Sequence, residues 1–124
     1  MGRRLAMCVV LALCACGGGA AMPEYVGRTE WTSTAELMAS FGTPCATGVP
    51  PAGLVAEVCA VAIATVGPAA PRTCAGDVAA VNWWTYWGTS RKVDCGADAT
   101  DPDFRRWHYL VEDDVPGWFL VEGR

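Results

Sequence analysis

The sequence predicts a small, mainly β domain of the α+β kind. It would contain an antiparallel meander of three to four strands, open or curled into a small barrel, with one short N-terminal helix and disulfide cross-links. Aromatic and β-branched residues dominate residues 77–87 and 104–112, as they do in strands. Pro116 and Gly117 separate the second run from a third apolar run, which is typical of a hairpin. Four cysteines lie in the same part of the chain: Cys45, Cys59, Cys74 and Cys95.

The predicted helix lies early in the domain, after a short extended segment over residues 22–31. Residues 32–34, Thr-Ser-Thr, precede Glu36, and a hydroxyl residue before an acidic first turn is typical of a helix N-cap. The helix is expected to continue to about Phe41. Residues 42–44, Gly-Thr-Pro, end it, because Gly suits the left-handed position after a helix and Pro cannot continue one.

Residues 54–66 are compatible with a helix or a strand. The alanines of this run permit a helix, whereas its valines and isoleucine prefer a pleated surface. Apolar residues occupy both parities, so periodicity does not decide between the two. The turn signals that follow, over residues 67–76, favour a strand.

Three strands are predicted in the second half of the chain. Residues 77–87 form the first, and residues 88–103 form a long polar connection. Residues 104–112 alternate between two faces, and residues 113–117 form a turn before a last strand at 118–122. Curling of this meander into a barrel would cover the edges of the sheet.

The end of the domain, residues 107–121, resembles the close of bacterial SH3-like modules. Trp107 lies in one predicted strand, and Gly117-Trp118 opens the next. The chain lacks the arginine-rich first strand that those modules usually carry. No ligand is therefore transferred from this resemblance.

The N-terminus has the pattern of an export signal. Arg3 and Arg4 precede an apolar run from Leu5 to Ala15, which is too short to span a bilayer as a helix. The run leads into Leu13-Cys14-Ala15-Cys16 and then three glycines, which resembles the lipobox of bacterial lipoproteins. Cys14 stands where a residue such as Ala or Ser is commoner in that family.

The lipoprotein resemblance implies that the Cys16 thiol carries a diacylglyceryl group and that the signal is cut between Ala15 and Cys16. It also implies that the new amino group is acylated, as by palmitate. The membrane would then be a partner through the lipid on Cys16, since two or three acyl chains make release negligible. An ordinary signal peptide cut after residues 19–21 and an uncleaved anchor are the alternatives.

With this cleavage, residues 1–15 are the signal peptide, residues 16–23 a lipidated flexible tether, and residues 24–124 a single small extracytoplasmic domain. The expected location is the bacterial cell envelope. Gly17, rather than Asp, follows the cysteine, which by resemblance to the lipoprotein sorting pattern favours the outer membrane where the host has one.

Cleavage also sorts the seven cysteines. Cys8 and Cys14 leave with the signal and Cys16 takes the lipid, so an even number remains for an oxidising compartment. Two disulfides are expected, and the preferred one of three pairings is Cys45 with Cys95 and Cys59 with Cys74. A four-cysteine zinc site would normally have paired C-x2-C spacing, which these cysteines lack, so no metal or cofactor is expected.

The mature domain is acidic. The whole chain has a net charge of −4, and removal of Arg3 and Arg4 with the signal leaves seven basic side chains against 13 acidic ones, a net charge of −6. Basic residues occur at most in pairs, at 91–92 and 105–106. No nucleic-acid partner is therefore expected.

Catalytic and metal-binding patterns are weak. His108 is the one histidine, and the serines lie in no nucleophile elbow, so we expect a partly exposed sheet histidine and no catalytic residues. Four aspartates crowd the polar connection: Asp94, Asp98, Asp101 and Asp103. The connection has neither the glycine nor the closing glutamate of an EF-hand, which favours solvated turn carboxylates over calcium ligands.

Six tryptophans suggest either core packing or a contact surface. Trp83, Trp107 and Trp118 are expected in the core, because a domain rich in Ala and Val needs large side chains to fill it. The predicted contact for an unidentified protein or glycan partner is the set Trp84, Tyr86 and Trp87, since both faces of one strand are not easily buried in a two-layer domain.

The sequence thus predicts a membrane-anchored extracytoplasmic lipoprotein with a non-enzymatic binding or envelope-structural domain. The alternative is a small secreted enzyme or inhibitor whose site is not visible in the sequence. An inhibitor would present an exposed loop between cysteines, and the interval from Cys74 to Cys95 is where such a loop is expected.

Overall fold

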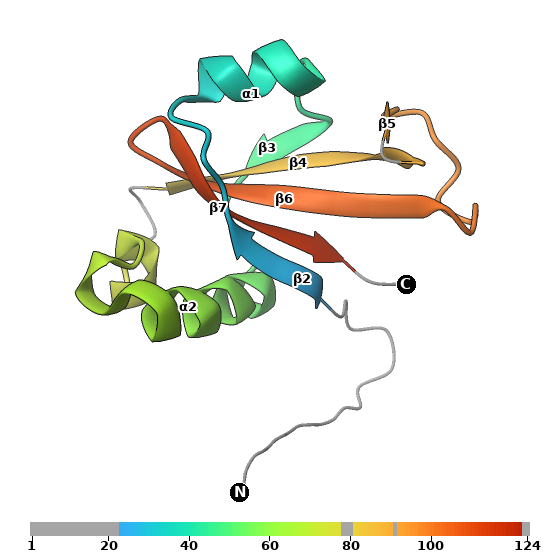
Figure 1. Cartoon of the computed structure of the whole chain (residues 1–124). Coiled ribbons are helices and arrows are strands. Elements are labelled where there is room, and N and C mark those ends of the chain that lie inside the picture. Colours follow the sequence, from blue (N-terminus) through green and yellow to red (C-terminus); the bar gives the residue numbers. More distant parts are fainter. Residues whose placement is uncertain (1–22, 78–80, 91, 123–124) are drawn as a thin grey trace, which may run out of the picture.

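The computed structural model describes residues 23–77, 81–90 and 92–122. Six antiparallel strands form one sheet in the order β2-β7-β6-β4-β3, with β5 paired to β4, and a helix lies on each face (Figure 1). The elements in chain order are β2 (Pro23–Arg28), α1 (Thr34–Phe41), β3 (Ala46–Gly48), α2 (Ala52–Val66), the 3-10 helices η2 (Gly67–Ala69) and η3 (Arg72–Ala75), β4 (Val81–Thr89), β5 (Lys92–Val93), β6 (Phe104–Glu112) and β7 (Val115–Glu122).

The predicted class of fold is confirmed in outline. The structure is a mainly antiparallel β domain, but its described residues form six strands and two α-helices where three to four strands and one helix were predicted. The sheet is open, with β2 at one edge and β3 at the other, so the barrel form is wrong. The extra strands are mostly short, at three residues for β3 and two for β5, too short to leave an alternating sequence pattern.

Helix α1 begins and ends where the sequence predicts. The Ser33 hydroxyl accepts a hydrogen bond from the Glu36 backbone N–H at 3.3 Å. The Glu36 carboxylate in turn accepts from the backbone N–H of Thr32 at 2.6 Å and from its hydroxyl at 2.9 Å. These hydrogen bonds lower the pKa of Glu36. Gly42 ends the helix at a φ of 82°, which a residue with a side chain rarely adopts.

The expected strand at residues 54–66 is wrong, because this run forms most of helix α2. Val58 and Ala62, one turn apart, are fully buried against the sheet, with Leu54 and Val66 partly buried beside them. The helix thus buries one face only, which the sequence does not reveal because its outer face is apolar too. Pro51 and Gly67 flank it as N-cap and C-cap.

The strands predicted in the second half of the chain are present, with small differences in their bounds. Strand β6 has the bounds predicted for it, whereas β4 begins and ends slightly later than residues 77–87. Residues 78–80 of that prediction lie outside the described residues. The last strand begins at Val115 rather than Trp118, because the turn consists of Asp113 and Asp114 alone, with φ values of 52° and 66°. Two successive positive φ values are typical of a tight hairpin turn.

Two apolar clusters lie on opposite faces of the sheet. The cluster under α2 contains Val58, Ala62, Trp83, Leu110, Trp118 and Leu120. The cluster under α1 contains Leu37, Tyr86, Tyr109 and Val111. Trp83 and Trp118 are therefore core residues as predicted, whereas Trp107 is only half-buried.

Both predicted disulfides are present, in the preferred pairing. Cys45 bonds to Cys95 with 5.4 Å between the Cα atoms, which ties the start of β3 to the loop after β5. Cys59 bonds to Cys74 with 5.5 Å between the Cα atoms, which ties α2 to η3. Disulfides persist in oxidising compartments, so both are consistent with an extracytoplasmic location.

Candidate functional site: an aromatic groove beside helix α1

An open groove of about 730 Å³ runs between α1 and the sheet. The segment that joins β2 to α1 forms one wall, α1 forms another, and the middle strands form the floor. The lining residues are Arg28, Thr29, Glu30, Trp31, Glu36, Ala39, Ser40, Tyr109 and Phe119. The volume lies in the range of small-molecule sites, which is roughly 300–1,000 Å³.

The floor of the groove is aromatic because of the hairpin register. Tyr109 of β6 lies opposite Phe119 of β7, and their ring centroids are 5.9 Å apart. Tyr25 of β2 continues the row, 5.4 Å from the Phe119 ring, and 56% of this tyrosine is exposed. Phe41 of α1 packs edge-on against Trp31 at 6.2 Å. Neighbouring rings at these separations offer flat faces on which a ligand can stack.

Tyr109 forms the buried base of this aromatic surface. Burial raises the pKa of Tyr109 to about 12, although hydrogen bonds from the Trp31 and Trp107 side chains act in the opposite direction. The phenol therefore stays neutral at physiological pH. Because Tyr109 is only 5% exposed, its role in the groove is to hold the neighbouring Trp31 ring in place rather than to contact a ligand.

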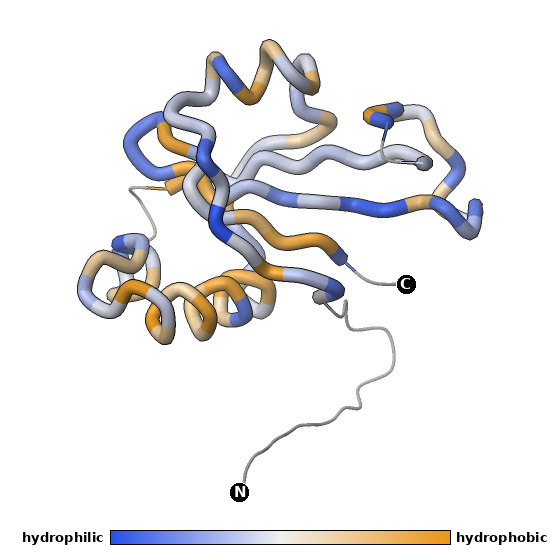
Figure 2. Tube along the Cα trace, viewed as in Figure 1, coloured by the Kyte–Doolittle hydropathy of each residue, from blue (hydrophilic) through white to orange (hydrophobic). Residues whose placement is uncertain are grey.

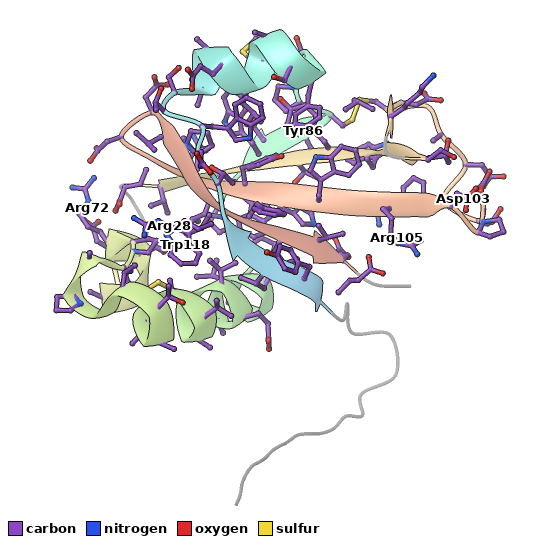
Figure 3. The ribbon with its side chains drawn as sticks, viewed as in Figure 1. Arg28, Arg72, Tyr86, Asp103, Arg105 and Trp118 are labelled. Carbon is purple, nitrogen blue, oxygen red and sulfur yellow. A yellow bond between two sulfur atoms is a disulfide. The ribbon has the colours of Figure 1, made fainter. Side chains whose placement is uncertain are left out.

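The predicted contact residues do not form one patch. Trp84 and Tyr86 face the α1 side of the sheet, whereas Trp87 faces the α2 side, since their partners in register are Tyr109, Trp107 and Arg106. Tyr86 is fully buried, so the expectation that it is exposed is wrong. Tyr86 lies on the side of the sheet that α1 covers (Figure 3). Its hydroxyl donates to the Gly42 carbonyl at 2.8 Å.

Trp84 and Trp87 are half-buried, and neither lines the groove. The Trp87 indole N–H donates to the Cys95 carbonyl at 2.8 Å, and the Arg106 guanidinium lies 5.5 Å from the centre of the Trp87 ring. Trp84 packs against the cluster under α1. Trp87 therefore packs against the loop that contains Cys95 and helps to hold it in place.

The sequence prediction missed the residues that line the groove. Trp31, Tyr109 and Phe119 come from three separate elements, and only the folded sheet brings them beside α1. The sequence contains one partial indication of this site. If the hairpin turn is assigned to Asp113 and Asp114 alone, the register places Tyr109 opposite Phe119. The position of α1 over the sheet has no comparable sequence signal.

His108 lies on the opposite face of the sheet from the groove and is 4% exposed, so the prediction of a partly exposed histidine is wrong. Its Nδ1 lies 2.8 Å from the Thr85 hydroxyl, and its Nε2 lies 2.5 Å from a Glu122 carboxylate oxygen. The Trp83 indole stacks on the imidazole at 5.0 Å. An ionised carboxylate only accepts, so Nε2 carries the proton and Nδ1 accepts from Thr85.

The environment of His108 favours the neutral imidazole. Burial and the nearby Arg106 charge together lower the pKa of His108, although the contact with Glu122 acts in the opposite direction. The chain Thr85–His108–Glu122 has the connectivity of a hydroxyl nucleophile with its base. Thr85 is only 7% exposed, however, so its hydroxyl does not face a substrate in this structure.

The acidic connection uses its carboxylates in its own turns. Asp94 accepts from the Gly96 N–H at 3.0 Å, Asp98 from the Thr100 N–H at 2.9 Å, and Asp101 from the Asp103 N–H at 2.8 Å. Within residues 23–77, 81–90 and 92–122, no three His, Cys, Asp or Glu side chains are grouped so that they could hold a metal ion.

No protein-family model, curated protein or solved structure matches this chain. Its function therefore has to be inferred from the groove, the disulfides and the N-terminal sequence.

Proposed function

We propose that this chain is an exported lipoprotein, anchored through Cys16, whose extracytoplasmic domain is a non-enzymatic binding module. The N-terminal pattern that ends in Leu13-Cys14-Ala15-Cys16 supports export and lipid attachment. The two disulfides add support, because they pair the four cysteines of the domain with one another and leave none of them to pair with Cys16.

The aromatic groove is the observation that carries the binding role. It combines the half-buried aromatic rings of Trp31 and Phe119 with charged side chains such as Arg28 and Glu36. Aromatic faces and a few fixed polar groups are the usual elements of glycan and peptide recognition. The proposed ligand is therefore a glycan or an extended segment of an envelope protein.

A small enzyme is the second candidate, because Thr85, His108 and Glu122 form a hydrogen-bonded chain. Because Thr85 is buried, these three hydrogen-bonded residues are better explained by a structural role. The inhibitor alternative has no such support, because the interval from Cys74 to Cys95 contains β4, a central strand of the sheet, in place of an exposed loop.

Lipid attachment is tested by Cys16→Ala, with Cys14→Ala as the matched control, in a bacterial host labelled with palmitate. We expect Cys16→Ala to lose the palmitate label. Cys14→Ala should keep the label, since residue 14 is removed with the signal. Label retained by Cys16→Ala would contradict the anchor.

Binding in the groove is tested by NMR titration of the protein with a tetramer of N-acetylglucosamine and, separately, with a proline-rich peptide. We expect one probe to shift the Trp31 indole resonance, and Trp31→Ala to weaken that binding at least tenfold. Trp84→Ala is the control, since Trp84 is half-buried on the same face but outside the groove. Shifts confined to residues outside the groove would contradict the assignment.

A further inference from the structure

We propose that the outer face of helix α2 lies on the surface of the bilayer and forms a second membrane contact beside the lipid on Cys16. This inference depends on the proposed anchor, since the lipid is what holds the domain near the membrane. It concerns a different surface from the groove, on the other face of the sheet.

The composition of α2 is unusual for a helix of which one face is exposed. Its 15 residues contain one charged side chain, Glu57, and no Lys or Arg. Ile63 is 52% exposed and Val61 is 37% exposed, and Ala60 and Ala64 are exposed as well, whereas Ala62 is buried against the sheet. A helix on the surface of a soluble domain normally has polar residues on its outer face. Figure 2 shows the apolar colouring along α2.

This apolar character is strong enough to resemble a membrane segment. By length and composition alone, Ala52–Ala69 is long and apolar enough to cross a bilayer, and only 11% of it is buried within the domain. Val58 and Ala62 nevertheless pack fully against the sheet, so the helix is part of the folded domain. A helix held in this way can place its outer face in the interface without spanning it.

The position of α2 brings this face within reach of the anchor. Helix α2 packs beside β2, the first described strand, and Val26 of β2 joins the cluster beneath the helix. Strand β2 begins at Pro23, seven residues after Cys16. Seven extended residues span at most roughly 25 Å. That is close to the length of α2 itself, roughly 22 Å for 15 residues.

A lipid surface fits this face better than a second copy of the chain does. A short tether holds the domain permanently at high local concentration of lipid, whereas contact with another copy depends on the density of the protein in the membrane. The absence of Lys and Arg from α2 also makes the contact apolar, so it should not depend on anionic lipid or on salt. With α2 on the membrane, the groove on the opposite face of the sheet would open away from it.

Photo-cross-linking tests the contact directly. The mature lipidated protein would carry benzoylphenylalanine in place of Ile63, in phosphatidylcholine vesicles. The matched control carries the same probe in place of Met38, which is 42% exposed on α1, on the opposite face of the sheet. We expect lipid adducts by mass at least fivefold more often at position 63 than at position 38, at both low and high salt.

The substitution Ala60→Glu places a charge on the exposed side of α2 and should lower the adduct yield at position 63. The disulfides and the circular dichroism spectrum should stay unchanged. Equal yields at the two positions, or covalent protein dimers instead of lipid adducts at position 63, would overturn the proposal. Flotation of the vesicles tests the anchor separately: protein that does not float refutes lipid attachment, whereas floating protein without a preferred adduct at position 63 refutes only the contact of α2.

Discussion

The two disulfides should stabilise the domain by different amounts, because they close loops of different length. The Cys45–Cys95 bond joins residues 50 apart in the sequence, and the Cys59–Cys74 bond joins residues 15 apart. In the chain-entropy account, a bond limits the unfolded chain more as its loop grows. This gives about 4 kcal/mol for the longer loop and about 3 kcal/mol for the shorter one.

The perturbation is replacement of each pair by alanine, C45A/C95A and C59A/C74A, so that no free thiol remains. Urea unfolding followed by tryptophan fluorescence, with the parent chain measured alongside, gives the free energy of unfolding of each variant. We expect C45A/C95A to lose about 1 kcal/mol more than C59A/C74A. Loss of both bonds, roughly 7 kcal/mol, should unfold most molecules, since small domains have total stabilities of about 5–15 kcal/mol.

Two results would refute this reasoning. The first is a larger loss for C59A/C74A than for C45A/C95A, which would mean that local packing of α2 on η3, rather than loop length, sets the contribution. The second is a loss below about 1 kcal/mol for either variant, which would mean that the native cross-link does not limit the unfolded chain as expected.

Three further predictions concern single side chains. Tyr86→Phe removes the hydrogen bond to the carbonyl at the end of α1 and should cost about 1 kcal/mol in urea unfolding, and an unchanged midpoint would contradict the role of this bond. Because burial lowers the pKa of His108 below its usual 6.5, the unfolded chain binds more protons than the folded chain below that pH. Stability should therefore fall between pH 7.5 and 5.5, and His108→Asn should reduce this dependence; an equal dependence in both proteins would show that another group is responsible. Gly88→Ala places a Cβ 1.7 Å from the Lys92 carbonyl oxygen and should cost about 1–3 kcal/mol by thermal unfolding, whereas Gly48→Ala, with open space around it, should change stability by less than about 0.5 kcal/mol.

The sequence predicted those parts of the fold that local chemistry determines. Ser33 and Glu36 mark the start of α1, and Gly42 marks its end, because capping involves neighbouring residues. The bounds of β6 followed from alternation, because that strand presents different residues to its two faces. Helix α2 was mistaken for a strand because its outer face is as apolar as its inner face, so the period of burial left no trace in the sequence.

The candidate site was less predictable than the fold. Tyr86 and Trp84 are adjacent to Trp87 on an aromatic strand, but whether an aromatic side chain is exposed depends on which helix covers it. Helix α1 lies over Tyr86, and the buried cluster beneath it includes Tyr109, whereas Phe119 is half-buried and Tyr25 is exposed. That placement results from packing between distant elements, and no local pattern encodes it.

The intact mass of the protein isolated from bacterial membranes tests the central claim most directly. The account predicts a chain that starts at Cys16, carries the mass of a diacylglyceryl group with or without a further acyl chain, and has lost the hydrogens of two disulfides. An unmodified chain that starts after residues 19–21, or a chain that retains residues 1–15, would contradict it.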